Sequence, residues 1–301
     1  MSAQPDSVAE VSAGLRGVGY LPGQSTALVA YLATKLGKPV LVEGPAGVGK
    51  TELAKALSRY LGRRLVRLQC YEGLDEAKAL YEWNYRKQLL RIQTESDDAG
   101  WSEVQDDIFS DDFLLPRPLM TAIATEEPVV LLIDEIDKTD QEFEAMLLEL
   151  LSDFQISIPE LGVIEARTQP VVLLTSNNTR ELTEALKRRC LYLWLDYPSL
   201  EHELSIVKLH TPELSDTVTR KLVELVQMVR DLDLKKPPSI AESIDWARAM
   251  LLLGADDIDA NLFNATMSII VKHRTDLDIV AERVGVQFGG LAGATGSART
   301  G

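Results

Sequence analysis

The chain has 301 residues, 46% of them hydrophobic, which is enough for one large core or two smaller ones. Its 46 Asp and Glu residues against 31 Lys and Arg residues give a formal net charge of -15. Nonspecific binding to a nucleic-acid backbone requires clustered Lys and Arg, so this charge balance argues against a nucleic-acid partner. The sequence contains no run of about 18 apolar residues, so no membrane span is predicted.

Both ends of the chain are rich in small and polar residues. Residues 1–16 lack the basic start and the apolar stretch of a signal peptide, so we expect a mobile N-terminus on a cytoplasmic protein. Residues 274–301 finish in a stretch rich in Gly, Ala and Ser, which predicts a C-terminal tail with a flexible end.

Five short, almost continuously apolar runs alternate with segments of helical periodicity. Runs of this kind are typical of strands that are buried on both faces of a parallel sheet. The alternation predicts an α/β fold, a three-layer αβα sandwich around a five-stranded parallel sheet. The runs are residues 39–44, 64–70, 128–134, 170–177 and 190–195.

The first run leads into the motif GxxxxGK(S/T), which precedes a predicted helix over residues 49–61. A strand before the motif and a helix after it are the context in which it binds a nucleoside triphosphate. Its glycines let backbone N–H groups surround the phosphates, its lysine contacts the β- and γ-phosphates, and its hydroxyl binds Mg²⁺. The predicted nucleotide site is Gly44, Pro45, Ala46, Gly47, Val48, Gly49, Lys50 and Thr51, with Thr51 as the metal ligand.

Two carboxylates at the end of the third run form the second part of the predicted site. Asp134 and Glu135 follow the apolar residues 129–133, at the edge where the carboxyl ends of parallel strands meet. We expect Asp134 to lie on the Mg²⁺ side of the phosphates and Glu135 to be the general base for the attacking water. A base for water indicates hydrolysis rather than transfer to an acceptor.

Polar residues also flank the fourth and fifth runs. Asn177 is placed to orient the attacking water, with Asn178 as a competitor and a simple Asx turn as the structural alternative. Lys187, Arg188 and Arg189 close a predicted helix. Cations there either stabilise the helix dipole or act as an arginine finger, which neutralises the transferred phosphoryl group and can come from a neighbouring subunit.

Two segments interrupt the alternation of strands and helices. Residues 155–166 contain two short extended pieces around a Pro and a Gly, which predict a hairpin. A second segment concentrates aromatic side chains among acids, which suits either a contact surface or packing of the segment on itself. The aromatic residues are Tyr71, Tyr81, Trp83, Tyr85 and Trp101.

After Pro198 the periodicity is helical throughout, which predicts a second, all-helical domain. Ser239 and Glu242 have the spacing of a capping box, so a helix is predicted to start there. The predicted helices are residues 199–210, 214–231, 239–253 and 259–273.

The ordered motifs resemble the AAA+ ATPase superfamily. Within it they are most similar to the MoxR branch, particularly the CoxD-like ATPases associated with maturation of molybdenum-containing carbon monoxide dehydrogenase. The residues that carry this resemblance lie between 39 and about 250. They are GPAGVGKT (44–51), CYEGLDEAKALYEWNYRKQLLRIQ (70–93), LLPRPLMTAI (114–123), LLIDEIDK (131–138), SIPELGVIEA (157–166), TSNN (175–178), ALKRRC (185–190) and PPSIAESIDWARAM (237–250).

The resemblance implies ATP and Mg²⁺ as ligands and assigns roles by position. Asn177 is similar to the sensor 1 polar residue, Arg189 to the arginine finger that acts on a neighbouring subunit, and Arg188 to its neighbour or substitute. Related proteins often place a sensor 2 arginine at the start of the third lid helix. This chain has residues 239–242 there, without an arginine, and Arg248 is the nearest.

The resemblance also implies an organisation and partners. Residues 17–197 correspond to the ATPase core and residues 198–273 to a helical lid. Residues 72–110 correspond to a helix 2 insertion and residues 155–167 to a pre-sensor 1 hairpin. A homo-oligomer in the form of a hexameric ring is expected, with a von Willebrand A domain partner and chaperone-like remodelling of a metalloenzyme client.

Two other classes share parts of this pattern. A nucleic-acid motor or clamp-loader-like ATPase has the same core, but the net charge of -15 argues against it. A P-loop phosphotransferase has the same phosphate-binding loop, but Glu135, Asn177 and the helical second domain favour hydrolysis.

Overall fold

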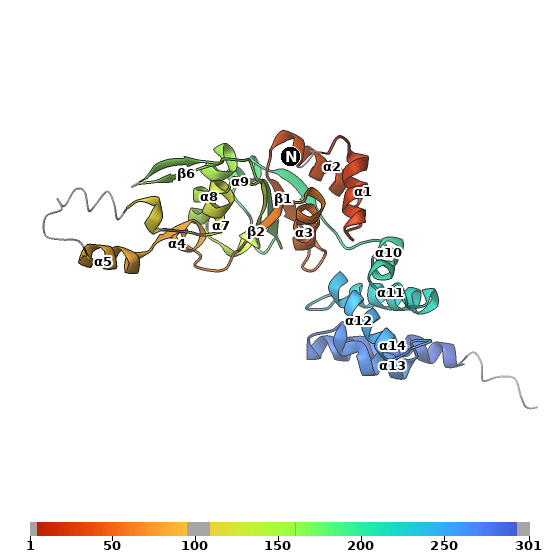
Figure 1. Ribbon diagram of the computed structural model, residues 1–301. Helices are drawn as coiled ribbons and strands as arrows, with labels where there is room; N and C mark the ends of the chain where they lie inside the picture. The colour runs from red at the N-terminus through yellow and green to blue at the C-terminus, as the bar shows by residue number, and fades with distance from the viewer. Residues whose placement is uncertain (1–4, 95–108, 160, 294–301) are drawn as a thin grey trace, which may run out of the picture. The chain divides into compact units, whose positions relative to one another are not determined.

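A computed structural model describes residues 5–94, 109–159 and 161–293 (Figure 1). The chain divides into two compact units. One contains the residues up to Gly44 and those from Lys50 to Leu195; the other contains residues 45–49 and those from Asp196 onward.

The first unit is built on a five-stranded sheet in which every neighbouring pair is parallel, as predicted. The strand order is β2-β5-β8-β1-β9. Because all five strands run the same way, their carboxyl ends lie along one edge of the sheet. The strands are β1 (Val40–Glu43), β2 (Arg64–Gln69), β5 (Val129–Asp134), β8 (Val171–Ser176) and β9 (Leu191–Trp194).

Helices cover both faces of this sheet, which confirms the three-layer fold. One face packs against α1 (Val8–Gly17), α2 (Gln24–Leu36) and α3 (Lys50–Leu61). The opposite face packs against α7 (Pro118–Ala124), α8 (Gln141–Asp153) and α9 (Glu184–Lys187). Successive strand residues alternate between the two cores: Val40, Val42, Val130 and Leu132 enter the first core, and Leu41, Leu131, Ile133 and Leu174 the second.

The prediction of a mobile N-terminus over residues 1–16 is wrong from Val8 onward, where α1 begins. The start of the helix is stabilised by two reciprocal hydrogen bonds. Ser7 Oγ accepts one from Glu10 N–H, and the Glu10 carboxylate accepts one from Asp6 N–H. Val11 and Leu15 are four residues apart and both are buried. Two apolar residues on one helix face are therefore enough to dock an otherwise small and polar segment.

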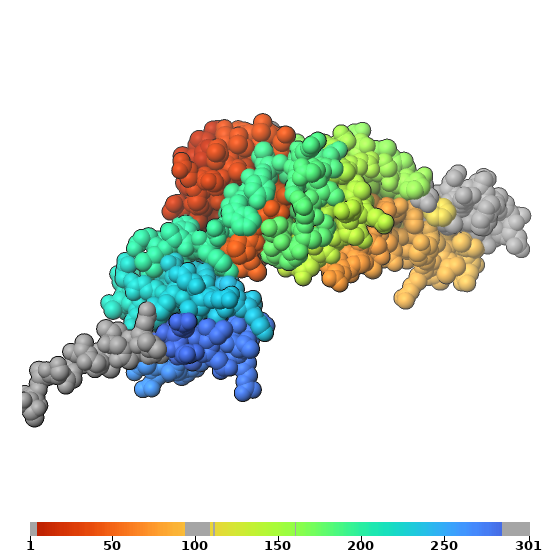
Figure 2. Space-filling model, turned by 180° about the vertical axis from the view of Figure 1, so that it is seen from behind, coloured from red at the N-terminus to blue at the C-terminus, as the bar shows by residue number. Residues whose placement is uncertain are grey.

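The aromatic segment forms a small substructure at one end of the first unit (Figures 1 and 2). Trp83 is buried and packs edge-on against Tyr81, whereas Tyr85 is exposed, so the segment packs on itself only in part. Trp101 lies outside the described residues. The elements are α4 (Glu76–Ala79), antiparallel strands β3 (Tyr81–Trp83) and β4 (Leu114–Pro116), α5 (Tyr85–Thr94) and the 3₁₀ turn η1 (Asp111–Phe113).

The hairpin expected around residues 155–167 consists of β6 (Gln155–Ile158) and β7 (Gly162–Glu165), which pair antiparallel. It follows α8 directly, because Phe154 ends that helix in a left-handed conformation.

The second unit is helical, and the capping box at Ser239 and Glu242 is present as predicted. The helix predicted over residues 259–273 is shorter in the structure than expected. At its end the Thr266 hydroxyl donates a hydrogen bond to Leu262 O, and the backbone continues as a 3₁₀ turn. The helices are α10 (Leu200–His210), α11 (Asp216–Arg230), α12 (Ile240–Leu252), α13 (Ala260–Thr266), η3 (Met267–Ile269) and α14 (Arg274–Gly293).

The prediction of a C-terminal tail from residue 274 is wrong, because α14 is part of this helical unit. Val280 and Val284 are buried in its core. The buried Asp276 carboxylate accepts hydrogen bonds from the backbone N–H groups of Lys235 and Lys236, which attaches the helix start to the loop after α11. Within the described part of the chain, every helix is too short or too polar to cross a membrane.

Candidate functional site

The phosphate-binding motif forms the turn between β1 and α3. Gly44 has φ 152°, and a Cβ there would lie 1.9 Å from the Leu195 carbonyl oxygen, so only glycine fits. Gly49 has φ 95° immediately before α3 begins at Lys50. The glycines therefore allow a left-handed path that ends at a helix N-terminus, where backbone N–H groups and the helix dipole favour an anion.

Lys50 is the charged centre of the site. Its Nζ donates hydrogen bonds to Gly44 O at 2.7 Å and to Asn177 Oδ1 at 2.9 Å, and the residue is only 7% exposed. Burial lowers the pKa of the Lys50 amine, while the nearby carboxylates of Asp137 and Asp134 oppose that shift. A buried amine that donates to these two neutral oxygens is suited to a phosphate, which would compensate its charge more fully.

The Asp134 carboxylate is buried at the end of β5 and receives three side chains. Thr51 Oγ1 donates to Asp134 Oδ1 at 3.0 Å, and Thr175 Oγ1 donates to the same oxygen at 2.5 Å. Arg67 of β2 donates to Oδ2 from Nε at 3.1 Å and from a terminal nitrogen at 2.5 Å. The adjacent hydroxyl and carboxylate offer the oxygen donors that Mg²⁺ prefers, so Thr51 and Asp134 fit the predicted metal.

Glu135 has an unusual backbone. Its φ of 59° and ψ of 49° are left-handed, a conformation that costs a non-glycine residue about 1–2 kcal/mol. A hydrogen bond from Glu135 N–H to Thr175 Oγ1 at 2.9 Å supports it. Among the described residues none hydrogen-bonds or ion-pairs with the half-buried Glu135 carboxylate, which leaves it available for a water molecule.

Thr175 connects these two acidic residues, because its one hydroxyl donates to Asp134 and accepts from Glu135 N–H. Thr175→Val keeps the shape but removes both bonds, at about 1–3 kcal/mol for each buried group left without a partner. We expect ATP turnover to fall about 10-fold or more, with a smaller effect on ATP affinity. The measurement is kcat beside the Kd for a fluorescent ATP analogue. Thr175→Ser, which retains the hydroxyl, is the control, and wild-type turnover in Thr175→Val would contradict the connecting role.

The two asparagines after β8 differ in position. Asn177 is half-buried and its side chain contacts Lys50, whereas Asn178 is exposed with φ 56° and donates its N–H to Ser176 Oγ at 2.9 Å. Asn177 is therefore the one that the structure brings beside the lysine of the phosphate-binding loop.

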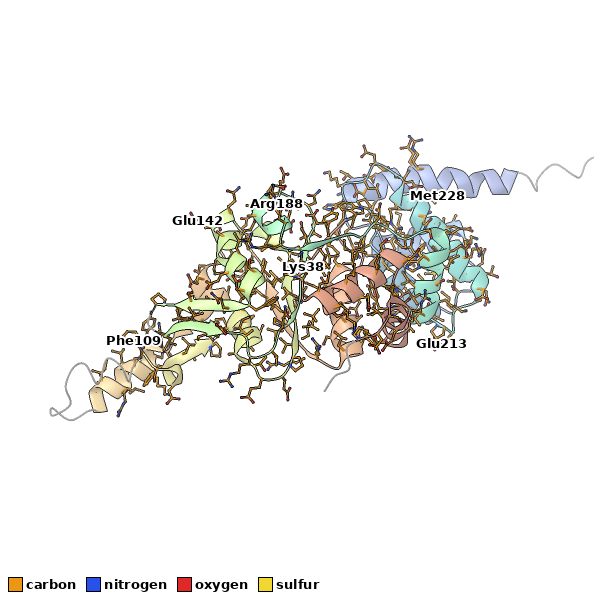
Figure 3. All side chains as sticks on the ribbon, turned by 90° about the horizontal axis from the view of Figure 1, so that it is seen from above. Lys38, Phe109, Glu142, Arg188, Glu213 and Met228 are labelled. Atoms are coloured by element: carbon orange, nitrogen blue, oxygen red, sulfur yellow. The ribbon has the colours of Figure 1, made fainter. Side chains whose placement is uncertain are left out.

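The two arginines after α9 also differ. Arg189 is tied to its own subunit, with Nε donating to Ser152 Oγ at 2.5 Å and Nη1 to Ala185 O at 3.0 Å. Arg188, labelled in Figure 3, is exposed, and within the described ranges its side chain forms no hydrogen bond or ion pair. No hydrogen bond or ion pair among described residues connects either arginine to Lys50 or Asp134.

Two residues of this cluster were not predicted from the sequence, Arg67 and Thr175. Arg67 lies two residues before Gln69, which pairs in register with Asp134. Its signal is an arginine near the carboxyl end of β2, a position outside the motifs at residues 44–51 and 134–135 on which the predicted site rests. Thr175 is the first residue of the TSNN stretch but has no special spacing.

Comparisons with known proteins find similarity over the part of the chain that contains the sheet. The AAA domain (dynein-related subfamily) matches residues 39–190, just over half of the chain. The chain is 23% identical over 205 residues to gas vesicle ATPase GvpN1 of Halobacterium salinarum, covering 65% of this chain and 57% of that protein. It is 30% identical over 182 residues to the uncharacterized protein YojN of Bacillus subtilis, covering 58% of this chain and 52% of that protein.

These alignments thus span little more than half the length of both relatives. A solved structure with a similar fold is that of a mutant of RuvB from Thermotoga maritima. It superposes with a TM-score of 0.50 at 18% identity and covers 89% of this chain and 73% of that one.

Proposed function

Since the chain belongs to the AAA domain family (dynein-related subfamily), we propose that it is an AAA+ ATPase that uses ATP hydrolysis to remodel a protein client. The AAA domain and the ATPase relatives support ATP hydrolysis as its reaction. The observation that carries the proposal is the meeting of Lys50, Thr51, Asp134 and Asn177 at one sheet edge, beside a Glu135 carboxylate that no described residue pairs with.

Each of these residues has a task in hydrolysis. Lys50 would hold the β- and γ-phosphates, and Thr51 and Asp134 would hold Mg²⁺, which would supply positive charge beside the phosphate oxygens. Glu135 accepts a proton from the attacking water, and Asn177 orients that water while adding no charge. Arg67 and Thr175 keep the Asp134 carboxylate in a fixed orientation.

Hydrolysis is distinguished from phosphotransfer by measuring phosphate release from Mg-ATP with no acceptor added. We expect release from the wild-type protein.

Lys50→Ala should weaken ATP binding about 10-fold or more, because a charge-assisted hydrogen bond contributes about 1.5–3 kcal/mol. Titration with a fluorescent ATP analogue measures this. Lys55→Ala is the matched control, because Lys55 lies on the same helix, its side chain is 44% exposed, and its ion pair is with Glu52, which is not one of the predicted site residues. Equal affinities of Lys50→Ala and wild type would contradict the assignment.

We also propose that the active form is a ring, a hexamer in the related proteins, in which the arginine pair of one subunit reaches the nucleotide of the next. The exposed position of Arg188 supports this, since within the described chain neither arginine hydrogen-bonds or ion-pairs with the site of its own subunit. AAA+ proteins are typically oligomeric, and light scattering with and without ATP tests the assembly.

The proposed client is a protein bound by the aromatic segment. Tyr85 is 62% exposed, and Leu89 and Leu90 of α5 are 59% and 63% exposed, which is the kind of apolar surface found in protein contacts. Resemblance to the CoxD-like ATPases favours a molybdenum enzyme under maturation in the cytoplasm, with a von Willebrand A domain partner. By contrast, the similar protein GvpN1, described above, is a gas vesicle ATPase. Stimulation of phosphate release by an immature molybdenum hydroxylase, and its loss in Leu89→Ser/Leu90→Ser, tests this client.

A further inference from the structure

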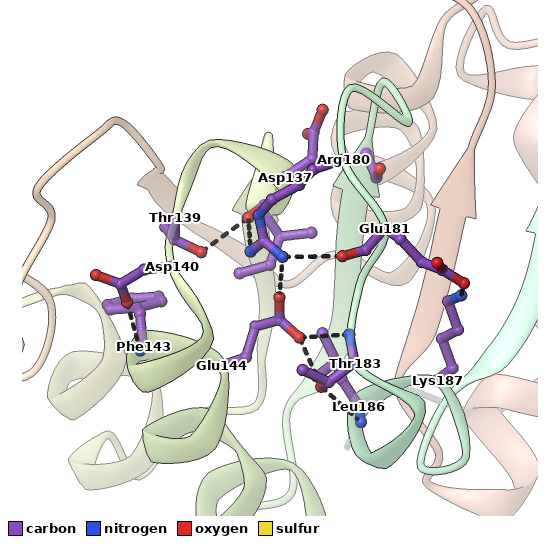
Figure 4. Close-up of polar contacts among 12 residues, drawn as sticks. Asp137, Thr139, Asp140, Phe143, Glu144, Arg180, Glu181, Thr183, Leu186 and Lys187 are labelled. Atoms are coloured by element: carbon purple, nitrogen blue, oxygen red, sulfur yellow. Dashed lines mark hydrogen bonds and ion pairs between the residues drawn. The ribbon is translucent and has the colours of Figure 1, made fainter.

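Helix α9, which ends beside Arg188 and Arg189, is fixed to α8 by a buried carboxylate. Glu144 of α8 is 0% exposed. Its Oε2 accepts hydrogen bonds from Thr183 N–H at 2.8 Å and from Thr183 Oγ1 at 2.6 Å. Its Oε1 forms an ion pair with Arg180 at 2.5 Å (Figure 4).

Thr183 is the N-cap of α9, and its Oγ1 accepts from Leu186 N–H. The same hydroxyl therefore donates to Glu144 and caps the helix. The other end of α9 is tied to α8 as well, through Arg189 and Ser152. Glu144 and Ser152 are eight residues apart on α8, about 12 Å at 1.5 Å per residue. The attachment through Glu144 involves neither arginine of the pair, so it is kept when Arg189 leaves Ser152.

The loop that leads into α9 needs such an attachment. Residues 177–183 connect Asn177 to α9 without regular secondary structure. On one side this loop lines a cavity of about 860 Å³, formed with residues 72–73 and 137–141, so packing does not hold it there. Polar contacts hold it instead: Asp137 accepts from Thr179 N–H and Oγ1, and Arg180 donates to Ile136 O.

From this geometry we infer that Glu144 is a positioning residue for the arginine pair, acting through Thr183 and α9 on the nucleotide of the neighbouring subunit. When a buried carboxylate is removed, the charged and polar groups that it paired with are left buried without a partner, which is destabilising. Removing Glu144 therefore releases the N-terminus of α9 and moves Arg188 and Arg189. The inference rests on the proposed hydrolysis with an arginine finger supplied by a neighbour.

The first test compares turnover with nucleotide binding. Glu144→Ala should lower kcat about 10- to 100-fold, because a displacement of about 1 Å in a catalytic group costs that much, and should leave the Kd for the ATP analogue unchanged. Thr183→Val should act in the same direction, and Thr183→Ser, which keeps the donor and the cap, should restore turnover. The control is Glu142→Ala. Glu142 is an exposed residue on α8, labelled in Figure 3, whose side chain forms no hydrogen bond or ion pair with another described residue.

The second test separates positioning from general damage. Glu144→Ala subunits keep their own Lys50, Glu135 and Asn177, while Glu135→Gln subunits keep an intact α9. Mixed rings therefore contain interfaces with a complete site. Activity several-fold above the average of the two separate preparations is expected, with assembly verified by light scattering. Thermal unfolding shows whether each variant folds, and Thr183→Val, which leaves the buried charges paired, replaces Glu144→Ala if that variant does not.

The outcomes identify which idea fails. Unchanged kcat in both Glu144→Ala and Thr183→Val, or a lower kcat that mixing does not restore, overturns the positioning role while hydrolysis stands. Absence of phosphate release from the wild type overturns the proposed hydrolysis. A wild-type rate in Arg188→Ala/Arg189→Ala overturns the arginine finger, and with it the positioning role of Glu144. Recovery in mixed rings, together with rescue by Thr183→Ser, supports the inference.

Discussion

Glu135→Gln is expected to bind Mg-ATP with wild-type affinity and to hydrolyse it about 10²- to 10⁴-fold more slowly, the range that a positioned general base contributes. The amide has the shape of the carboxylate but accepts no proton at neutral pH. Binding is preserved because, among the described residues, the Glu135 side chain forms no hydrogen bond or ion pair with Thr51, and it is only one of four carboxylates whose charge acts on the Lys50 amine. Single-turnover hydrolysis of labelled ATP and the Kd of the fluorescent analogue measure the two effects separately.

The backbone conformation of Glu135 makes the result of this experiment easier to interpret. Its left-handed conformation depends on the N–H bond to Thr175, which the glutamine variant retains. A loss of turnover therefore reports on the carboxylate rather than on a rearranged strand end. Glu142→Gln on α8 is the matched control for the same chemical change at an exposed position. Turnover within about 3-fold of wild type in Glu135→Gln would remove Glu135 from its role as base.

The sheet and the main site were predictable because their signals are local. The inner strands β1, β5 and β8 are apolar runs buried on both faces, whereas the edge strands β2 and β9 are partly exposed. The motif at residues 44–51 lies where a strand becomes a helix. Parallel strands then place Asp134 and Asn177 at one edge without further information. The hydrogen bonds from Lys50 to Asn177 and from Thr51 to Asp134 follow that expectation.

The features that were missed depend on pairing or packing between distant segments. Arg67 contacts Asp134 only because β2 and β5 are neighbours in the sheet. The sequences of these two strands do not predict that they are neighbours. α1 and α14 each bury a few side chains in segments that are otherwise small or polar, so their composition resembles that of chain ends. Glu144 resembles an exposed helix residue in sequence and is buried only because the loop before α9 covers it.

The arginine pair should have the largest effect of all on hydrolysis. Arg188→Ala/Arg189→Ala is expected to lower kcat about 10³-fold or more, since an arginine finger contributes about 10³–10⁵ to phosphoryl transfer. ATP affinity should change little, because neither arginine has a hydrogen bond or ion pair with the described site residues of its own subunit. The single variants assign the role: Arg188 is exposed and unpaired within the described chain, while Arg189 must first leave Ser152 and Ala185.

Mixing decides whether the pair acts on its own subunit or on the next. The double arginine variant keeps an intact Glu135, and Glu135→Gln keeps both arginines, so a ring containing both variants has interfaces where every catalytic group is present. Equimolar mixtures should regain activity far above either preparation alone, and each variant diluted to half its concentration in buffer measures simple dilution. If assembled mixed rings stay as slow as the separate variants, the arginines serve their own subunit, and α9 has to move toward Lys50 rather than toward a neighbour.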